Sequence, residues 1–234
     1  MSASKKLEKT MTDREDISLG VHNRAVILDL DNESRSWRYG EKPDYTKSEE
    51  RLAKHSKYNH TEGSLAAIAQ NLVRVFEMEA SFKENPSEWC SIAQEKFVMQ
   101  TNNGRAYTAE EIANIGTYNT FLPKSEHYDP EREDFQSSAD VFHTAFPEGF
   151  LWELVEVYSA PPVVTFKWRH WGEFTGHFKS YDGTGKTIEI VGVSVAHVND
   201  RLQIERLEHY FDNSKFLQGL TAGCPFHNNG GATQ

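Results

Sequence analysis

The sequence is poor in cysteine, and it contains no long run of apolar residues. Its two cysteines, Cys90 and Cys224, could form at most one bridge in 234 residues, so we interpret both as reduced thiols. Apolar runs such as Ala25–Leu28 are short, whereas a membrane-spanning helix needs roughly 20 apolar residues. The first twenty residues carry charges of both signs and no apolar segment, which does not fit a secretory signal. These absences predict a cytoplasmic protein with no membrane span and no disulfide framework.

Basic residues are also in the minority. The chain has 25 Lys and Arg against 35 Asp and Glu, which leaves a formal charge of −10 at pH 7. A surface with this excess repels the phosphate backbone of nucleic acids unless its positive charge is strongly clustered. We therefore expect no nucleic-acid partner.

The usual signatures of cofactor, metal and nucleophile sites are missing as well. No dinucleotide fingerprint, Gly-x-Ser-x-Gly elbow or His-Glu-x-x-His motif occurs. Gly183–Thr187 resembles the end of a phosphate-binding loop, but Ser180 stands where its first glycine belongs, so we interpret it as a hairpin turn. Cys224 and His227 would supply only half of a zinc site. The sequence predicts neither a cofactor nor a metal, and any chemistry would use side chains alone.

Apolar residues make up 38% of the chain and aromatic residues 12%, which is enough for one sizeable core. We expect residues 1–35 to be a disordered or loosely attached arm, because its first part has little apolar surface to bury. Trp37 and Tyr39 could anchor the chain after this arm. Residues 36–223 would form a single domain, and residues 224–234 a flexible tail.

Helical patterns dominate the first half of the domain, and strand patterns dominate the second. Helices are predicted from the N-cap Ser64 to about Lys83, from Thr108 to about Ile115, and from about Phe135 to Phe146. Strands are predicted at Lys96–Gln100, Phe150–Ser159, Pro162–Phe174, Thr187–Val198 and Arg201–Asp212. The short links between the later strands favour antiparallel neighbours. The predicted fold class is α+β, with helices across one face of a curved antiparallel sheet.

Three ionisable residues stand where a functional site could form. Glu79 falls near the middle of the apolar face of the first long helix. It could be a desolvated acid–base group, or it could form a structural ion pair with a buried arginine. His170 shares the more apolar face of its strand with Trp168. It could be a core histidine, or it could act as a proton shuttle if that face lines a cavity. Asp212 ends the last strand, where it could be a proton-transferring carboxylate or the cap of the next turn.

The sequence does not decide which face of the last strand points inward, because the apolar residues before and after its middle favour opposite faces. A bulge near Glu205 or Arg206 would reconcile the two halves. On this pattern alone, either His209 or Tyr210 could face inward.

Several short motifs occur in order over residues 36–223 and carry a family resemblance. They are Trp37-Arg38-x-Gly40, Glu62–Leu65, Glu77–Glu79, Phe146–Phe150, Arg169–Gly176, Thr184–Lys186 and Leu207–Asp212. Together they resemble the SnoaL-like branch of the NTF2-like superfamily, most closely the pathogen-related proteins of plants and their fungal relatives. The resemblance implies a conical α+β barrel with a deep, mostly apolar pocket, and a homodimer. It also implies cofactor-free proton transfers in enzymatic members, and Asp212 matches the aspartate that ends the family's last strand.

Within such a pocket, three further residues are candidates. Arg38 could close over the pocket and bind an oxygen that becomes negative, or its guanidinium could stack on Trp37 or Tyr39. Tyr118 could donate a phenol proton or belong to the core. Glu131 lies in an insertion that would cross the pocket mouth, unless that insertion is a solvated acidic loop.

We therefore expect a cofactor-independent isomerase or cyclase that acts by acid–base catalysis on a hydrophobic secondary metabolite, namely a polyketide, terpenoid or indole alkaloid. Its catalytic residues would come from Arg38, Glu79, Tyr118, Glu131, His170 and Asp212. The alternative is a non-enzymatic small-molecule-binding or stress-response protein that uses the same pocket. Titratable groups that converge in the cavity would favour the enzyme, and an all-apolar lining would favour the binding protein.

Overall fold

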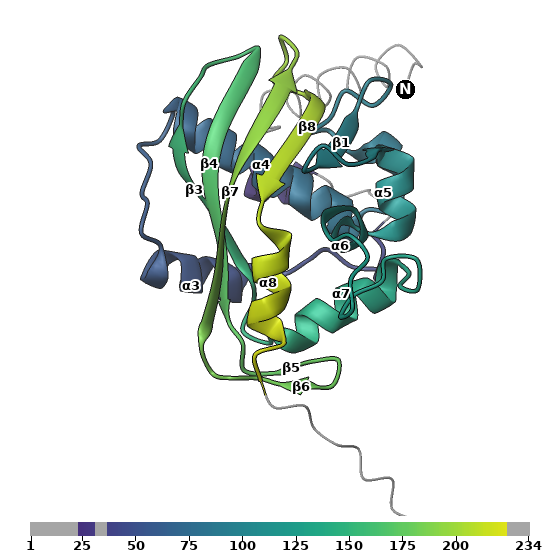
Figure 1. Cartoon of the computed structure of the whole chain (residues 1–234). Coiled ribbons are helices and arrows are strands. Elements are labelled where there is room, and N and C mark those ends of the chain that lie inside the picture. The colour runs from purple at the N-terminus through teal and green to yellow at the C-terminus, as the bar shows by residue number, and fades with distance from the viewer. Residues whose placement is uncertain (1–22, 31–36, 224–234) are drawn as a thin grey trace, which may run out of the picture.

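The computed structural model describes residues 23–30 and 37–223, in which helices cover one face of a curved sheet (Figure 1). The helices are α2 (Arg24–Leu30), α3 (Thr46–His55), α4 (Leu65–Phe82), α5 (Ala109–Ile115), α6 (Thr117–Phe121), α7 (Phe135–Ala145) and α8 (Asn213–Leu220), with a 3-10 turn η1 at Pro86–Glu88. The strands are β1 (Val98–Thr101), β2 (Ala106–Thr108), β3 (Leu151–Val157), β4 (Val163–Glu173), β5 (His177–Phe178), β6 (Tyr181–Asp182), β7 (Thr187–Val198) and β8 (Ile204–Phe211). The predicted α+β class is confirmed. Among the described helices, none combines the length and the apolar character needed to cross a membrane.

The main helices begin where their capping residues stand. Ahead of α4, the Ser64 hydroxyl accepts a hydrogen bond from the backbone N–H three residues later at 3.2 Å. Thr108 and Glu111 form a capping box at the start of α5, and Asp134 and Ser137 form one at the start of α7. These caps satisfy backbone donors that have no partner within the helix. The predicted starts of these three helices are confirmed to within one residue.

Six strands form the main sheet in the order β2-β1-β8-β7-β4-β3. Their pairing is antiparallel except between β1 and β8, which run parallel. Glu205 is left unpaired in β8, because its neighbours Ile204 and Arg206 pair with consecutive residues of β7. This bulge confirms the one expected from the sequence, and it places His209 rather than Tyr210 in the cavity lining described below.

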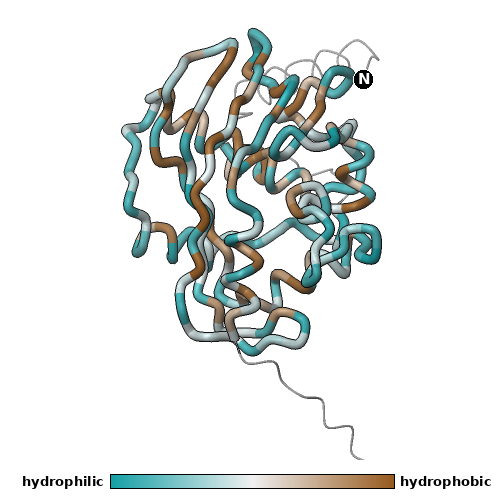
Figure 2. Tube along the Cα trace, in the orientation of Figure 1, coloured by the Kyte–Doolittle hydropathy of each residue, from teal (hydrophilic) through white to brown (hydrophobic). Residues whose placement is uncertain are grey.

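The core lies between the concave face of the sheet and the helices. Aromatic rings stack in it, with Phe142 of α7 on Phe216 of α8 at 5.7 Å, and Phe146 on Phe150, which directly precedes β3, at 4.4 Å between ring centroids. Figure 2 shows hydrophobic segments within the strands and helices of both layers, while the peripheral loops are mainly hydrophilic. Each large apolar side chain buried in this way contributes about 1.5–3 kcal/mol to the free energy of unfolding.

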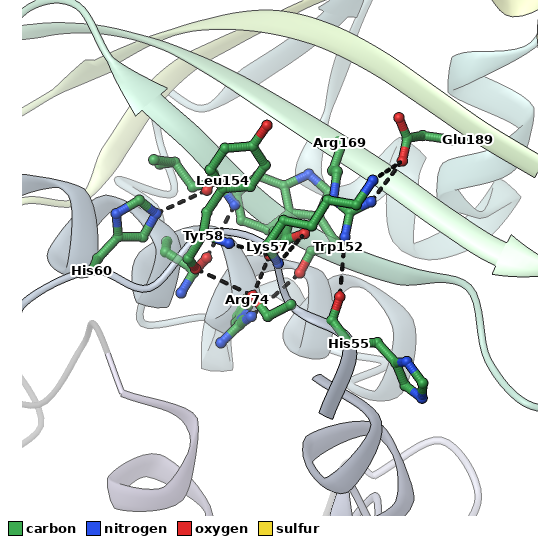
Figure 3. Close-up of polar contacts among 12 residues, drawn as sticks. His55, Lys57, Tyr58, His60, Arg74, Trp152, Leu154, Arg169 and Glu189 are labelled. Carbon is green, nitrogen blue, oxygen red and sulfur yellow. Dashed lines mark hydrogen bonds and ion pairs between the residues drawn. The ribbon is translucent and has the colours of Figure 1, made fainter. Parts of the chain in front are cut away.

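Buried charges tie the last residue of α3 and the residues 56–60 that follow it to the sheet (Figure 3). Glu153 of β3 accepts hydrogen bonds from the Ser56 hydroxyl and from the next two backbone N–H groups, the latter at 3.2 and 3.4 Å. Arg169 of β4 pairs with Glu153 and also, at 2.6 Å, with Glu189. Burial raises the pKa of Glu153, but the bond from Ser56 and the pairing with Arg169 outweigh it and hold the pKa below its ordinary value.

Of the expected N-terminal arm, the structure describes residues 23–30. There α2 packs through Ile27 against Val75 and Met78 of α4, in a small cluster completed by Trp37. The other expectations for the chain ends concern residues 1–22, 31–36 and 224–234, including the tail with Cys224, and lie outside the described residues.

Replacing Arg169 with Met should lower the free energy of unfolding by about 3–5 kcal/mol, because Glu153 would stay buried without its counter-ion. Urea unfolding followed by circular dichroism measures the loss, with exposed Arg201→Met as the matched control. Adding Glu153→Gln to the Arg169→Met variant should recover part of it, since the buried charge is then removed. A loss below about 1 kcal/mol would contradict the assigned role of the pair.

Candidate active site

A cavity of about 470 Å³ lies between the helices and the concave face of the sheet. This volume falls in the range of small-molecule sites. Much of the lining is aromatic: Tyr45, Phe76, Phe121, Phe142, Phe146, Phe150, Trp152, Trp168, Phe211 and Phe216. Ionisable side chains interrupt this apolar lining, among them Arg24, Arg74, Glu77, Tyr118, His170 and His209.

Glu77 on α4 and His170 on β4 form a pair in the cavity lining, with 3.6 Å between Oε1 and Nε2. The Glu77 side chain is 42% exposed, whereas His170 is 18% exposed and stacks on Phe150 at 4.0 Å. Burial raises the pKa of Glu77, but the contact with His170 and the charges of nearby arginines outweigh it, so the pKa lies below its ordinary value. Glu77 is therefore an ionised carboxylate at neutral pH.

Two arginines supply the positive charge beside Glu77. Arg24 of α2 lies over the Tyr45 ring at 3.9 Å and pairs with Glu49 at 3.6 Å. Arg74, one turn before Glu77 on α4, donates a hydrogen bond to a backbone carbonyl of β3 at 3.3 Å. Burial, followed by the charge of Arg24, lowers the pKa of Arg74 to about 10, which leaves it protonated at neutral pH.

A second polar group, formed by Trp168, Ser194 and His209, connects strands β4, β7 and β8. The indole Nε1 of Trp168 donates to the Ser194 Oγ at 2.7 Å, and this oxygen lies 2.8 Å from Nδ1 of His209. The other ring nitrogen of His209, Nε2, has no hydrogen-bond partner in the part of the chain that the structure describes. Burial lowers the pKa of His209 to about 4, so its imidazole is neutral at pH 7.

Tyr118 of α6 lies in the same cavity lining, as predicted for a pocket residue. Its ring stacks on Phe142 with 4.0 Å between centroids. Burial, followed by the charge of Glu77, raises the pKa of Tyr118, so its phenol keeps the proton and can act as a hydrogen-bond donor.

Comparison with known proteins assigns the chain to a family. No family model matches it. A pathogen-related protein of barley (Hordeum vulgare) is 35% identical over 216 residues, which cover 85% of this chain and 92% of the barley protein. The chain belongs to the pathogen-related protein family. The family resemblance carried by the sequence motifs is therefore confirmed.

Solved structures give more distant likenesses. A candidate SnoaL-like polyketide cyclase from Jannaschia sp. CCS1 is 12% identical with a TM-score of 0.37, over 70% of this chain and 100% of that one. A phenazine biosynthesis-related protein from Pseudomonas aeruginosa is 13% identical with a TM-score of 0.34, over 80% of this chain and 88% of that one. At these identities and TM-scores, neither likeness bears on the activity of this member of the family.

The structure places Arg38 and Glu131 outside the cavity lining, in contrast to their expected positions at the pocket mouth. The Arg38 guanidinium lies over the ring of Phe135 at 3.6 Å, and its Nη2 donates to the carbonyl of Ala113 at 2.9 Å. Glu131 is 80% exposed and pairs with Lys124 at 3.4 Å. Both side chains therefore make structural contacts outside the cavity.

Glu79 and Asp212 also lie outside the cavity lining. Glu79 is buried as expected, but its cation is Lys83, at 3.8 Å, instead of an arginine. Its two oxygens accept hydrogen bonds from the backbone N–H groups and side chains of Cys90 and Ser91. Asp212 caps α8 by accepting from the backbone N–H three residues later at 2.9 Å. Glu79 is therefore a structural ion-pair partner and Asp212 a helix cap, which are the structural roles that the sequence left open for them.

Sequence reasoning missed Glu77, Arg74 and Arg24, and it left His209 undecided. Glu77 follows Val73 by one helical turn, and both side chains line the cavity. That spacing could have indicated a second inward face of α4. Within the described ranges, no three His, Cys, Asp or Glu side chains gather closely enough to hold a metal ion.

Replacing Glu79 with Gln should lower the free energy of unfolding by about 1–3 kcal/mol, because an amide nitrogen cannot accept the bonds that the second carboxylate oxygen accepts. Ligand binding in the cavity should not change, since Glu79 does not line it. Thermal unfolding measures the loss, with exposed Glu84→Gln as the control. An unchanged melting temperature would contradict the structural role.

The depressed pKa of His209 makes stability depend on pH. The unfolded state binds a proton near the ordinary pKa of 6.5, and the folded state only near about 4. Stability should therefore fall as pH drops from about 6.5 to 4, by up to about 3 kcal/mol from this group. His209→Asn should remove that part of the slope, whereas exposed His177→Asn should retain it in urea titrations at several pH values. Equal slopes in both variants would count against the buried neutral imidazole.

Proposed function

We propose that this protein is a cofactor-independent isomerase or cyclase that moves protons within a hydrophobic small molecule of the secondary-metabolite class. The observation that carries the proposal is the Glu77–His170 pair in the lining of an aromatic cavity. A protein that only stored or carried an apolar ligand would need no ionised carboxylate there, because an apolar ligand that displaces water from a charge costs free energy. Titratable groups that converge in one cavity favour the enzyme over the binding protein.

The reaction follows from the charges in the cavity. The ionised Glu77 takes a proton from an acidic C–H or O–H bond of the substrate, and its contact with His170 orients the carboxylate. The electron pair left behind moves into the conjugated system of the substrate. The same proton then returns from Glu77 to another atom, so the product is an isomer and no co-reactant is consumed. Ring closure follows the same course when the electron pair attacks a carbonyl carbon within the substrate: the π pair of that C=O bond moves to its oxygen, which takes the proton back from Glu77.

Further groups in the lining support this proton transfer. The protonated phenol of Tyr118 can donate a hydrogen bond to an oxygen that becomes negative. Arg74 keeps positive charge beside Glu77 and so favours the carboxylate between turnovers. Aromatic side chains fill much of the remaining wall, which excludes water from the reacting atoms. The homodimer expected from the sequence resemblance stays a prediction.

Exchange of hydrogen for deuterium tests the proposal without knowledge of the natural substrate. Wild-type protein should accelerate exchange of the α-hydrogens of at least one of three ring ketones, 1-tetralone, 2-tetralone and anthrone, in deuterated buffer. Glu77→Gln should lower the protein-dependent rate by roughly 10²-fold or more, because the amide cannot take the proton. Proton NMR of the ketone measures the exchange.

Glu131→Gln is the matched control, because it removes a carboxylate of the same kind outside the cavity lining and should exchange like the wild type. Circular dichroism verifies that each variant is folded. If none of the three ketones undergoes Glu77-dependent exchange, the cavity belongs to a binding protein instead.

A further inference from the structure

His209 lies in a part of the cavity lining that carries no charge. Its imidazole packs against Phe121 at 5.2 Å and against Trp168 at 6.4 Å between ring centroids, both in T-shaped geometry. The residue is 9% exposed, and burial is the one cause of its lowered pKa, with no contribution from a charged neighbour. A full negative charge would find no counter-ion here, which makes this region suited to a neutral polar group.

The hydrogen bonds around Ser194 determine the tautomer of His209. The indole N–H of Trp168 can only donate, so the Ser194 oxygen must accept from it. Ser194 then uses its one hydroxyl hydrogen toward Nδ1 of His209, the remaining partner of this oxygen among the described residues. Nδ1 is thus an acceptor, and the neutral imidazole carries its proton on Nε2. In the opposite tautomer, the hydroxyl hydrogen of Ser194 would have no acceptor.

The resulting Nε2–H is a buried donor without a partner in the described chain. Leaving such a donor unsatisfied costs free energy, and unsatisfied buried groups are rare in native proteins. Its side chain belongs to the lining of a cavity large enough for a small molecule, and the neighbouring ring of Phe121 belongs to the same lining. A ligand is therefore the natural source of the missing acceptor.

We propose that Nε2–H of His209 donates a hydrogen bond to a carbonyl oxygen of the ligand, so that the ligand class is a hydrophobic ring ketone or its enol. A donor requires an acceptor, and the uncharged aromatic surroundings favour a neutral oxygen over a carboxylate or phosphate. This assignment rests in part on the proposed function. If Glu77 removes a proton next to that carbonyl, the same donor holds the oxygen on which negative charge develops.

Binding of a matched pair of probes tests the assignment. 1-Tetralone and tetralin share one carbon skeleton, and only the ketone can accept a hydrogen bond. His209→Phe keeps an aromatic ring and removes the donor, so the ratio of tetralone affinity to tetralin affinity should fall by about tenfold relative to wild type. Isothermal titration calorimetry measures both affinities. His177→Phe, which replaces an exposed histidine outside the lining, should keep the wild-type ratio.

Two further measurements apply if His209→Phe does not fold. Ser194→Ala removes the hydroxyl that keeps the proton of His209 on Nε2, so it should lower the ratio of tetralone affinity to tetralin affinity by a smaller factor. Nitrogen-15 NMR of the wild type should place the proton of His209 on Nε2 at pH 7. A proton on Nδ1, an unchanged ratio in the variants, or a wild type that binds neither probe would overturn the assignment.

These results are separate from those on the proposed function. A lowered ratio without Glu77-dependent exchange supports the ketone contact while the isomerase proposal fails. Exchange that depends on Glu77, together with an unchanged ratio, overturns the ketone contact and leaves the isomerase proposal standing.

Discussion

The contact between Trp168 and Gly192 determines how the side chains on the sheet side of the cavity are positioned. The two residues are directly opposite in the pairing of β4 with β7. A Cβ atom at position 192 would lie 2.3 Å from the indole ring, so the ring can rest against the backbone of β7 only because that residue is glycine. In this position Nε1 reaches Ser194, and Ser194 in turn reaches His209. One missing side chain therefore sets the orientation of a tryptophan, a serine and a histidine.

The cavity combines two kinds of polar environment within one apolar lining. Around Glu77 and His170, the contact with His170 and the charges of Arg24 and Arg74 keep a half-exposed carboxylate ionised in the wall of an apolar cavity. Around His209 there are aromatic rings and a serine hydroxyl, so the imidazole stays neutral. A site that both removes a proton and holds the oxygen of the resulting enolate needs these two environments, because a base must be charged and a donor need not be.

Local signals in the sequence were sufficient for most of the secondary structure. Ser64 and Thr108 begin helices because their hydroxyls cap backbone donors, and the alternation of apolar residues locates β4 and β7 to within one residue at each end. Helix α3 was not predicted, because it is held by contacts made after folding. The segment that follows it is bound by buried Glu153, which lies about 95 residues later in the chain. No local pattern reveals such a partner.

The candidate site was predicted only in part, and Glu77 and Glu79 explain why. Both lie on α4, which has apolar neighbours on more than one side: Phe76 faces the main core, whereas Val75 and Met78 face α2 and Trp37. Periodicity identifies a buried helix face, but it does not say whether that face meets a cavity, a turn or another helix. Glu79 meets Cys90 and Ser91, and Glu77 meets His170 from a strand more than 90 residues away.

The sequence by itself determined the fold class, the family, and the inward orientation of His170, because caps, strand alternation and motif order are local properties of the chain. Tertiary structure alone decided which ionisable side chains share the cavity. It moved Arg38 and Glu131 out of the site, brought Glu77 and Arg24 into it, and resolved His209 through the bulge at Glu205. The reason is physical: the role of an ionisable side chain depends on partners and burial supplied by distant segments, and these exist only once the chain has folded.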